Sequence, residues 1–331
     1  MTHCKFQKLF FLMLFTGCFI FSVAAEDNAA GDNGGFKTST DLQFQVSTRP
    51  EARLRLNESL IFPFLQGSGP LTKDNNITTV FSADVTPVSV SGIAEVNWTP
   101  AAFFVLSGGG RAGSGWNMPL GMGIGINAPE DKSAPAPAPG DTPRKAKIYG
   151  DAFDGLLWSA WGAGTLQFDL AAIFPGDWNH VLFQSRHEFR YAAYSRAGAG
   201  DAWVFENDER ENQNGWIYYA SFVVGYHMPL SPVLDTIAFM AELNKNLYNT
   251  PGGGRYGDDI GQWIFSGLFN FTIDPRFSAA LAIQMWTRRN YGTSNFEDTN
   301  HYYRDYVLSD DGGQLRLVFY RAAVIFTYKI H

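Results

Sequence analysis

The chain has 331 residues, a formal net charge of −7, 15% aromatic residues and only 17% charged residues. Soluble domains typically carry about 25% charged residues, so this composition favours a protein with a large apolar surface that does not face water. The acidic balance argues against a nucleic-acid partner. The two cysteines, Cys4 and Cys18, both lie near the N-terminus, so no disulfide framework or cysteine-based metal site is expected in the rest of the chain.

Residues 1–25 have the pattern of an export signal. Lys5 and Lys8 precede an apolar run that ends in the small residues of 23–25, as signal peptides do. A retained membrane anchor and lipoprotein acylation at Cys18 are the alternatives. Cleavage would remove two lysines, so the net charge would change from −7 to −9.

Short segments follow in which apolar and polar residues alternate. Residues 26–40 are polar and glycine-rich, and we expect a flexible periplasmic lead-in there. Alternation with period two predicts strands, and no later apolar run reaches the 18 residues of a membrane-spanning helix. Twelve strands are expected, with ten or fourteen as alternatives, at 41–47, 52–64, 77–86, 88–98, 101–110, 156–174, 180–194, 216–228, 235–248, 262–273, 277–289 and 314–331.

Between the fifth and sixth strands lies the longest irregular stretch, 113–151. It contains the run SAPAPAPG, which predicts an extended, solvated loop. Just before it, GGGRAG at 108–113 has the glycine spacing of a dinucleotide-binding loop. No helical pattern follows it, so we interpret it as the glycine-rich end of a strand.

The connections in the second half of the chain alternate in length. Short proline turns lie near residues 175, 229 and 275, whereas the loops at 195–215, 249–261 and 290–312 are long and polar. Transmembrane barrels have short turns at the periplasmic rim and longer loops outside. The turn near Pro87 departs from this pattern, because it is short yet would lie on the outer side.

The last segment shows why the strands should close into a ring. Even-numbered residues from Val318 to Ile330 are apolar or aromatic, whereas Arg321, Thr327 and Lys329 have the opposite parity. If the apolar face meets lipid, every backbone amide needs a partner within the protein, and only a closed barrel provides that for strands. We therefore predict a transmembrane antiparallel up-and-down β-barrel over residues 41–331.

Strand parity also predicts which charged residues point into the lumen. Barrels of eight strands are filled by side chains and those of sixteen or more hold a water channel, so twelve strands predict a narrow or partly plugged pore. The charges either pair and fill the lumen or take part in conduction or ligand binding. The predicted lumen set contains seven basic and five acidic residues: Arg53, Arg55, Asp84, Glu95, Asp169, Arg186, Glu188, Arg190, Glu242, Arg288, Arg321 and Lys329.

One residue does not fit the parity. His187 falls on the lipid-facing side among Phe183, Phe189 and Tyr191. We expect either a β-bulge at this point or burial of the imidazole against a neighbouring side chain.

No chemical motif predicts a cofactor or a metal ion. HEFRY at residue 187 lacks the second histidine of a zinc-binding H-E-x-x-H. The acidic pairs at 258–259 and 310–311 could bind divalent cations, but solvation of the loops is the better explanation for them. His301, near Asp298, Asp305 and Ser294, is the one candidate for catalysis at the outer rim.

The export signal, the cysteine-free remainder of the chain, the alternating segments and the closing strand together resemble the Gram-negative outer-membrane β-barrel class over residues 41–331. The closing strand, with Phe326, Tyr328 and Ile330, is similar to the signal read by the barrel-assembly machinery, although His331 follows. The resemblance implies an outer-membrane location, contact with outer-membrane lipids, and a channel or transporter for small or hydrophobic solutes. A barrel enzyme acting on lipid or protein and a structural or adhesive barrel with a sealed lumen remain alternatives.

Overall fold

The computed structural model describes residues 10–12, 21–23, 36–49, 51–118, 123–129, 146–199, 201–206, 212–228, 233–248, 260–289 and 314–331. Within the segment interpreted as an export signal, two short strands, β1 (Phe10–Leu12) and β2 (Phe21–Val23), pair with each other. Among the described residues, no helix has both the length and the apolar composition needed to cross a membrane.

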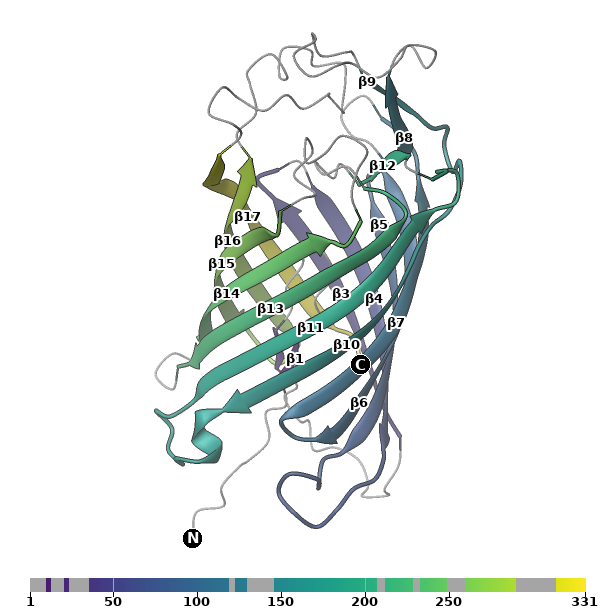
Figure 1. Ribbon diagram of the computed structural model, residues 1–331. Helices are drawn as coiled ribbons and strands as arrows, with labels where there is room; N and C mark the ends of the chain where they lie inside the picture. The colour runs from purple at the N-terminus through teal and green to yellow at the C-terminus, as the bar shows by residue number, and fades with distance from the viewer. Residues whose placement is uncertain are drawn as a thin grey trace.

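Twelve strands form one closed antiparallel barrel, as predicted (Figure 1). Each strand pairs with the next barrel strand along the chain, and the last pairs with the first, so the ring has no free edge. The barrel strands are β3 (Lys37–Ser47), β4 (Ala52–Pro63), β5 (Asn76–Thr86), β6 (Ser89–Ala101), β7 (Phe104–Gly115), β10 (Leu157–Asp169), β11 (Val181–Tyr194), β13 (Gly215–His227), β14 (Leu234–Asn246), β15 (Gln262–Thr272), β16 (Phe277–Arg289) and β17 (Leu315–Lys329).

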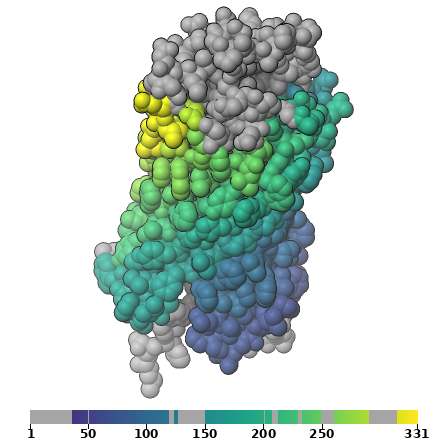
Figure 2. Space-filling model, viewed as in Figure 1, coloured from purple at the N-terminus to yellow at the C-terminus, as the bar shows by residue number. Residues whose placement is uncertain are grey.

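The two faces of the wall differ as the alternation predicts. In β6, Ser91, Glu95 and Asn97 are buried inside, whereas Val90 and Val96 are exposed outside. Side chains of neighbouring strands close over the backbone on the face seen in Figure 2. Exposed apolar residues of the barrel strands include Phe44, Leu54, Leu56, Phe81, Val85, Leu106, Trp158, Leu166, Phe183, Phe189, Trp216, Phe222, Val224, Phe239, Ile283, Leu317 and Phe319. A lipid environment accounts for so broad an apolar exterior.

In the second half of the chain the connections alternate in length as predicted. In the first half, the connection 64–75 at the short-turn end is long and the connection 48–51 at the long-loop end is short. The turn at Pro87 does lie at the long-loop end, because β5 and β6 form a hairpin there. β3 begins at Lys37, inside the segment that we expected to be a lead-in. β10 ends at Asp169, earlier than predicted, because the 3-10 helix η1 (Leu170–Ala172) follows; the Asp169 carboxylate accepts a hydrogen bond from the Ala171 amide and caps it.

The prediction of two wholly irregular outer loops is wrong. Part of the stretch 113–151 forms β8 (Ile124–Pro129) and β9 (Ala146–Tyr149), and part of 195–215 forms β12 (Ala202–Phe205). These three strands make a small sheet in the order β12-β8-β9 at the long-loop end of the barrel (Figure 1). Ile124, Trp203 and Phe205 of this sheet are buried in one apolar cluster with the barrel residues Leu157, Ala192 and Tyr194. This contact explains why the sheet is held against the barrel.

The uniform parity expected for the closing strand is also wrong. The register between β16 and β17 shifts so that Gln284 faces Arg321 while Met285 faces Phe319, which leaves Tyr320 as the extra residue of a β-bulge. Before the bulge, Leu317 and Phe319 are therefore the outward residues. Tyr320 stacks on the buried Trp286, with ring centroids 4.4 Å apart.

His187 stays on the outer face without a bulge. Its Nδ1 lies 2.7 Å from the Tyr218 hydroxyl and its Nε2 lies 3.0 Å from Ser185 Oγ. The imidazole also stacks beside Tyr218 and contacts the ring of Phe222 edge-on. The imidazole is exposed, so neither the expected β-bulge nor the expected burial occurs. Hydrogen bonds to neighbouring side chains satisfy both ring nitrogens instead.

Candidate functional site in the barrel lumen

Most of the predicted lumen residues lie on the inner face of the wall. Nine of the twelve have side chains that are largely enclosed: Arg53, Arg55, Asp84, Glu95, Arg186, Glu188, Arg190, Glu242 and Arg321. Their positions on alternate residues of β4, β5, β6, β11, β14 and β17 account for this shared direction.

The other three lie near the ends of strands. Asp169 is at the short-turn end, where its side chain is 35% exposed and pairs with His180 Nδ1 at 2.8 Å. Arg288 lies near the other end of β16, with its guanidinium 5.8 Å from the Trp286 ring. Lys329 is the last residue of β17, opposite Asp41 of β3.

One group of paired residues, which we name the wall cluster, consists of Glu95, Trp161, Arg186, Glu188 and Arg190. Glu188 is fully buried and its two oxygens contact Arg186 at 2.8 Å and Arg190 at 2.6 Å. Glu95 lies 3.6 Å from Arg186 and accepts a hydrogen bond from the Trp161 indole at 2.8 Å. All five side chains come from barrel strands, so the cluster binds β6, β10 and β11 together.

The glycine-rich segment of β7 makes room for this cluster. A Cβ on Gly109 would lie 2.6 Å from the Trp161 ring and 2.7 Å from the Ala94 carbonyl oxygen. The absence of a side chain at Gly109 leaves the space that the Trp161 indole occupies as it donates to Glu95. GGGRAG is therefore part of a strand, as predicted, and its central glycine has a packing role.

Further polar contacts continue round the wall from β13, which pairs with β11, to β17. The Tyr219 hydroxyl donates to Glu242 at 2.5 Å. Arg321 donates to Gln284 at 2.7 Å and pairs at 2.5 Å with Glu51, which lies in the turn between β3 and β4.

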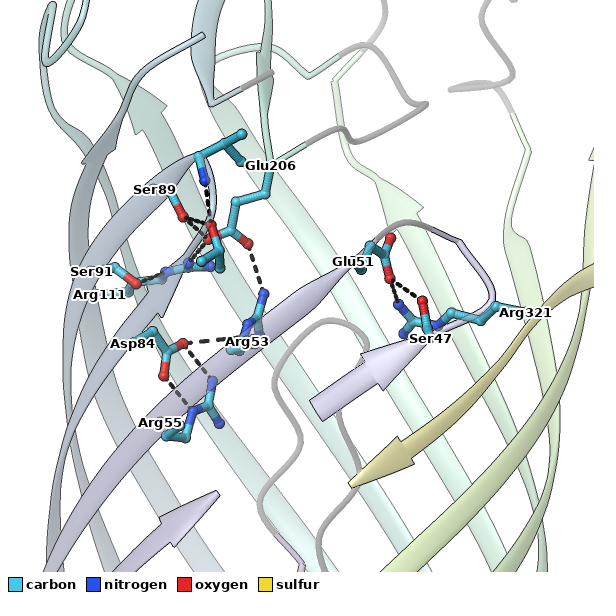
Figure 3. Close-up of polar contacts among 12 residues, drawn as sticks. Ser47, Glu51, Arg53, Arg55, Asp84, Ser89, Ser91, Arg111, Glu206 and Arg321 are labelled. Atoms are coloured by element: carbon cyan, nitrogen blue, oxygen red, sulfur yellow. Dashed lines mark hydrogen bonds and ion pairs between the residues drawn. The ribbon is translucent and has the colours of Figure 1, made fainter. Parts of the chain in front are cut away.

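A further group lies at the long-loop end, and we name it the mouth cluster: Arg53, Arg55, Asp84, Ser89, Arg111 and Glu206 (Figure 3). Arg55 makes two hydrogen bonds with the Asp84 carboxylate, at 2.5 and 2.7 Å. Arg53 lies 3.9 Å from the same carboxylate. The barrel strands thus give this cluster three guanidinium groups and one carboxylate.

The sixth member of the mouth cluster does not come from the barrel wall. Glu206 follows β12, and its carboxylate reaches Arg53 at 2.8 Å, Arg111 at 2.7 Å and the Ser89 hydroxyl at 2.7 Å. Figure 3 shows this side chain pointing to the two arginines from above the wall. Its backbone has φ of 55°, a conformation that residues other than glycine rarely adopt and that often marks a functional constraint.

Glu206 is negatively charged over a wide pH range. Burial raises its pKa, but the guanidinium groups of Arg111 and Arg53 and the Ser89 hydrogen bond lower it more, to about 2. The carboxylate of Glu206 therefore remains an anion while it pairs with Arg53 and Arg111.

Sequence reasoning missed Arg111 and Glu206. Arg111 has the inward parity of β7, but the strand was expected to end at residue 110, five residues before its actual end at Gly115. Glu206 belongs to a segment expected to be an irregular loop, and it is 153 residues from Arg53 in sequence. The period-two pattern carries no information on a contact of this kind.

Other predicted groups lie outside the described residues. These are His301, Ser294, Asp298 and Asp305 of the catalytic hypothesis and the acidic pairs at 258–259 and 310–311. Within the described part of the chain, no group of three or more histidine, cysteine, aspartate or glutamate residues has the arrangement of a metal site.

Comparisons with known proteins find likeness only among solved structures. No protein-family model matches the chain, and no curated protein matches it. The porin NanC is 8% identical, with a TM-score of 0.41, over 88% of this chain and 100% of its own. The KdgM porin is 10% identical, with a TM-score of 0.35, over 88% and 99%. The β domain of the Bordetella autotransporter BrkA is 9% identical, with a TM-score of 0.38, over 89% and 98%.

The architecture itself places the chain in a class. The ring of twelve strands is closed, its outer face is apolar and its inner face carries paired charges and amides. In a wall of this kind every backbone N–H and C=O group finds its hydrogen-bond partner within the protein, and the side chains turned to lipid are mainly apolar. The chain therefore has the architecture of a transmembrane β-barrel.

Proposed function

We propose that this outer-membrane barrel is a passive channel for small hydrophilic solutes. The observation that carries the proposal is the predominance of polar and charged side chains on the inner face, including Asn57, Glu95, Arg186, Gln284 and Arg321. One apolar cluster, formed by Val223, Met240, Leu268 and Ala282, interrupts them on β13 to β16. Water and hydrophilic solutes can exchange hydrogen bonds with such a wall as they pass. With its long-loop end outside, the mouth cluster would be met first by a solute entering the cell.

The same lining argues for hydrophilic rather than hydrophobic solutes. An apolar molecule inside the barrel would displace water from charged groups such as Arg190 and Glu188 without forming hydrogen bonds to them. Desolvation of charges is costly. Twelve strands also lie between barrels that are filled and barrels with wide water channels. This supports a narrow pathway that excludes large solutes.

Planar-bilayer recording tests the proposal directly. The purified barrel, shown to be folded by its heat-modifiable migration on gels, is added to a bilayer in potassium chloride. We expect steady single-channel steps, and liposomes carrying the protein should swell in small sugars but not in large oligosaccharides. A folded barrel that gives neither current nor swelling would refute a channel function.

A sealed structural barrel is the second candidate, and one observation favours it. Glu188, Ser221 and Gln284 are almost completely enclosed, as expected if side chains fill part of the lumen. In that case the bilayer would show no current and the liposomes would not swell, while the barrel would still fold and insert.

A catalytic barrel is a third possibility that the described residues do not support. Its candidate residues, His301 and Ser294, can be replaced together and the variant assayed for hydrolysis of lipid and protein substrates. Activity that is present in the wild type and lost in this variant would replace the channel proposal by an enzymatic one.

We also propose that β17 engages the barrel-assembly machinery. Phe326 and Tyr328 lie on its outward parity at the short-turn end, and Phe326 stacks on Phe277 with ring centroids 6.0 Å apart. Replacing Phe326 and Tyr328 by alanine should reduce the amount of folded protein in the outer membrane. Replacement of inward Thr327 by alanine is the control.

A further inference from the structure

The mouth cluster contains a carboxylate ligand held by a site that the barrel strands build. Arg53 of β4, Ser89 of β6 and Arg111 of β7 supply two guanidinium groups and a hydroxyl, and all three contact the Glu206 carboxylate. Guanidinium groups and hydroxyls converging on two oxygens form a receptor for carboxylates in general. The carboxylate present here belongs to a loop segment and is not fixed in the wall.

The receptor residues are positioned independently of Glu206. Arg111 Nε donates to Ser91 Oγ at 3.1 Å, and its guanidinium lies 4.9 Å from the Phe205 ring. Ser89 Oγ lies 2.8 Å from the Thr86 hydroxyl. Arg53 lies beside Asp84, which Arg55 engages through both oxygens. Removal of the Glu206 side chain would therefore leave much of the donor set in place.

Charge in the cluster points to the same class of ligand. The strands contribute three arginines and only one carboxylate, Asp84, so without Glu206 the mouth carries an excess of positive charge. Glu206 is 15% exposed at its side chain, so solvent reaches the position where a competing anion would arrive. Glu206 can leave by side-chain rotation, while β12 stays paired with β8.

We propose that Arg53, Ser89 and Arg111 form a binding site for solutes that carry a carboxylate, and that Glu206 occupies this site as a built-in competitor until such a solute displaces it. The inference rests on the proposed channel function and names its substrate class, small organic acids. Glu206 then has two roles: it neutralises the mouth when no solute is bound, and it limits how tightly an acid is held, which favours release into the lumen.

The probe pair is gluconate and sorbitol, which share a six-carbon polyol chain and differ in the carboxylate. Binding is measured by calorimetry on the full-length barrel in detergent, after heat-modifiable migration shows that each variant is folded. Glu206→Ala should bind gluconate about tenfold more tightly than the wild type, because a competitor for charge-assisted hydrogen bonds is removed. Sorbitol should bind neither protein measurably.

Two further variants locate the effect. Adding Arg53→Gln to the Glu206→Ala protein should abolish the gain in gluconate affinity. Glu51→Ala is the matched control, because Glu51 is also a carboxylate outside the barrel strands that pairs with a lumen arginine, Arg321; it should leave gluconate affinity unchanged. Glu206→Gln keeps the shape of the side chain and should give a smaller gain than Glu206→Ala.

Calorimetry tests the carboxylate site and conductance tests the channel, so each proposal can be refuted without the other. If gluconate binds Glu206→Ala no better than the wild type, or if sorbitol binds equally well, the carboxylate site is refuted even when the channel conducts. If no variant conducts in bilayers, the channel proposal fails, and the calorimetric result still decides whether the site exists.

Discussion

The wall cluster and the mouth cluster are both networks of arginines and carboxylates, yet they differ in where the acids come from. In the wall cluster, Glu95 and Glu188 lie on β6 and β11, and their partners Arg186 and Arg190 lie on β11 as well. In the mouth cluster, Glu206 arrives from the loop that carries β12. Strand residues cannot move apart without breaking the barrel, whereas a loop residue can.

This difference separates structural from functional pairing within one lumen. A buried pair whose members are both fixed in the wall fills space and sets the spacing of the strands. A pair with one member on a loop can open while the barrel stays intact. In the mouth cluster the proposed binding residues Arg53, Ser89 and Arg111 lie on the rigid strands, and only the carboxylate that would be displaced lies on a loop.

The largest effect is expected from Glu188→Ala in the wall cluster. It would leave Arg186 and Arg190 without the fully buried carboxylate that they share, and breaking a buried pair in this way costs about 3–5 kcal/mol. Denaturant unfolding of the barrel in detergent, followed by tryptophan fluorescence, measures the change. A loss close to zero would show that water fills the wall cluster.

A smaller loss is expected for Trp161→Phe. The change removes the indole N–H that donates to Glu95 at 2.8 Å, which leaves a buried charged acceptor without this donor and costs about 1–3 kcal/mol. Trp158→Phe on the same strand is the control, because Trp158 is outward and 40% exposed. Equal losses for the two variants in the same unfolding assay would contradict the assigned faces of β10.

The mouth cluster should tolerate loss of its loop carboxylate better than the wall cluster tolerates loss of Glu188. Glu206→Ala is expected to lower the free energy of unfolding by about 1 kcal/mol or less, because water reaches Arg53 and Arg111 once the loop side chain is gone. The same denaturant series measures it. A loss as large as that of Glu188→Ala would mean that Glu206 is a structural element of the barrel.

The smallest effect is expected from mild acid. Because the pKa of Glu206 is lowered to about 2, its contribution is complete above the ordinary carboxyl range near 4.5 and is lost only as the pH falls through about 2. The charged groups that face Glu206 or its partners are Arg53 and Arg55 of β4, Arg111 of β7 and Asp84 of β5. Hydrogen exchange of residues 202–206 should therefore be equally protected at pH 7 and pH 5, after correction for the intrinsic rate. Opening at pH 5 would show that the arginines do not hold the carboxylate.

The sequence was sufficient to predict the barrel because its signal repeats. All twelve strands, and the faces of most of them, depend on local patterns that each segment carries by itself, as β6 illustrates with Val90 and Val96 outside and Ser91 and Glu95 inside. A single uncertain segment, such as the one near Pro87, does not change the count when its neighbours are clear.

The features that the sequence could not predict are a β-bulge and contacts between distant segments, which leave no repeating pattern in the sequence. The β-bulge at Tyr320 inserts one residue without a change in composition, so the parity of Leu317 and Phe319 was assigned to the wrong face. The β12-β8-β9 sheet joins two separate loops, and Glu206 meets Arg53 across 153 residues of chain. Contacts of this kind depend on the closed barrel already being formed.

Ion selectivity in planar bilayers tests the central claim most directly. It shows whether ions pass through the charged interior and whether the charge of Glu206 sets the selectivity at the mouth. In a potassium chloride gradient, the wild-type barrel should give steady steps, and Glu206→Gln should move the reversal potential towards that of chloride. A folded barrel that carries no current, or one whose reversal potential is the same with and without the Glu206 charge, would contradict the account.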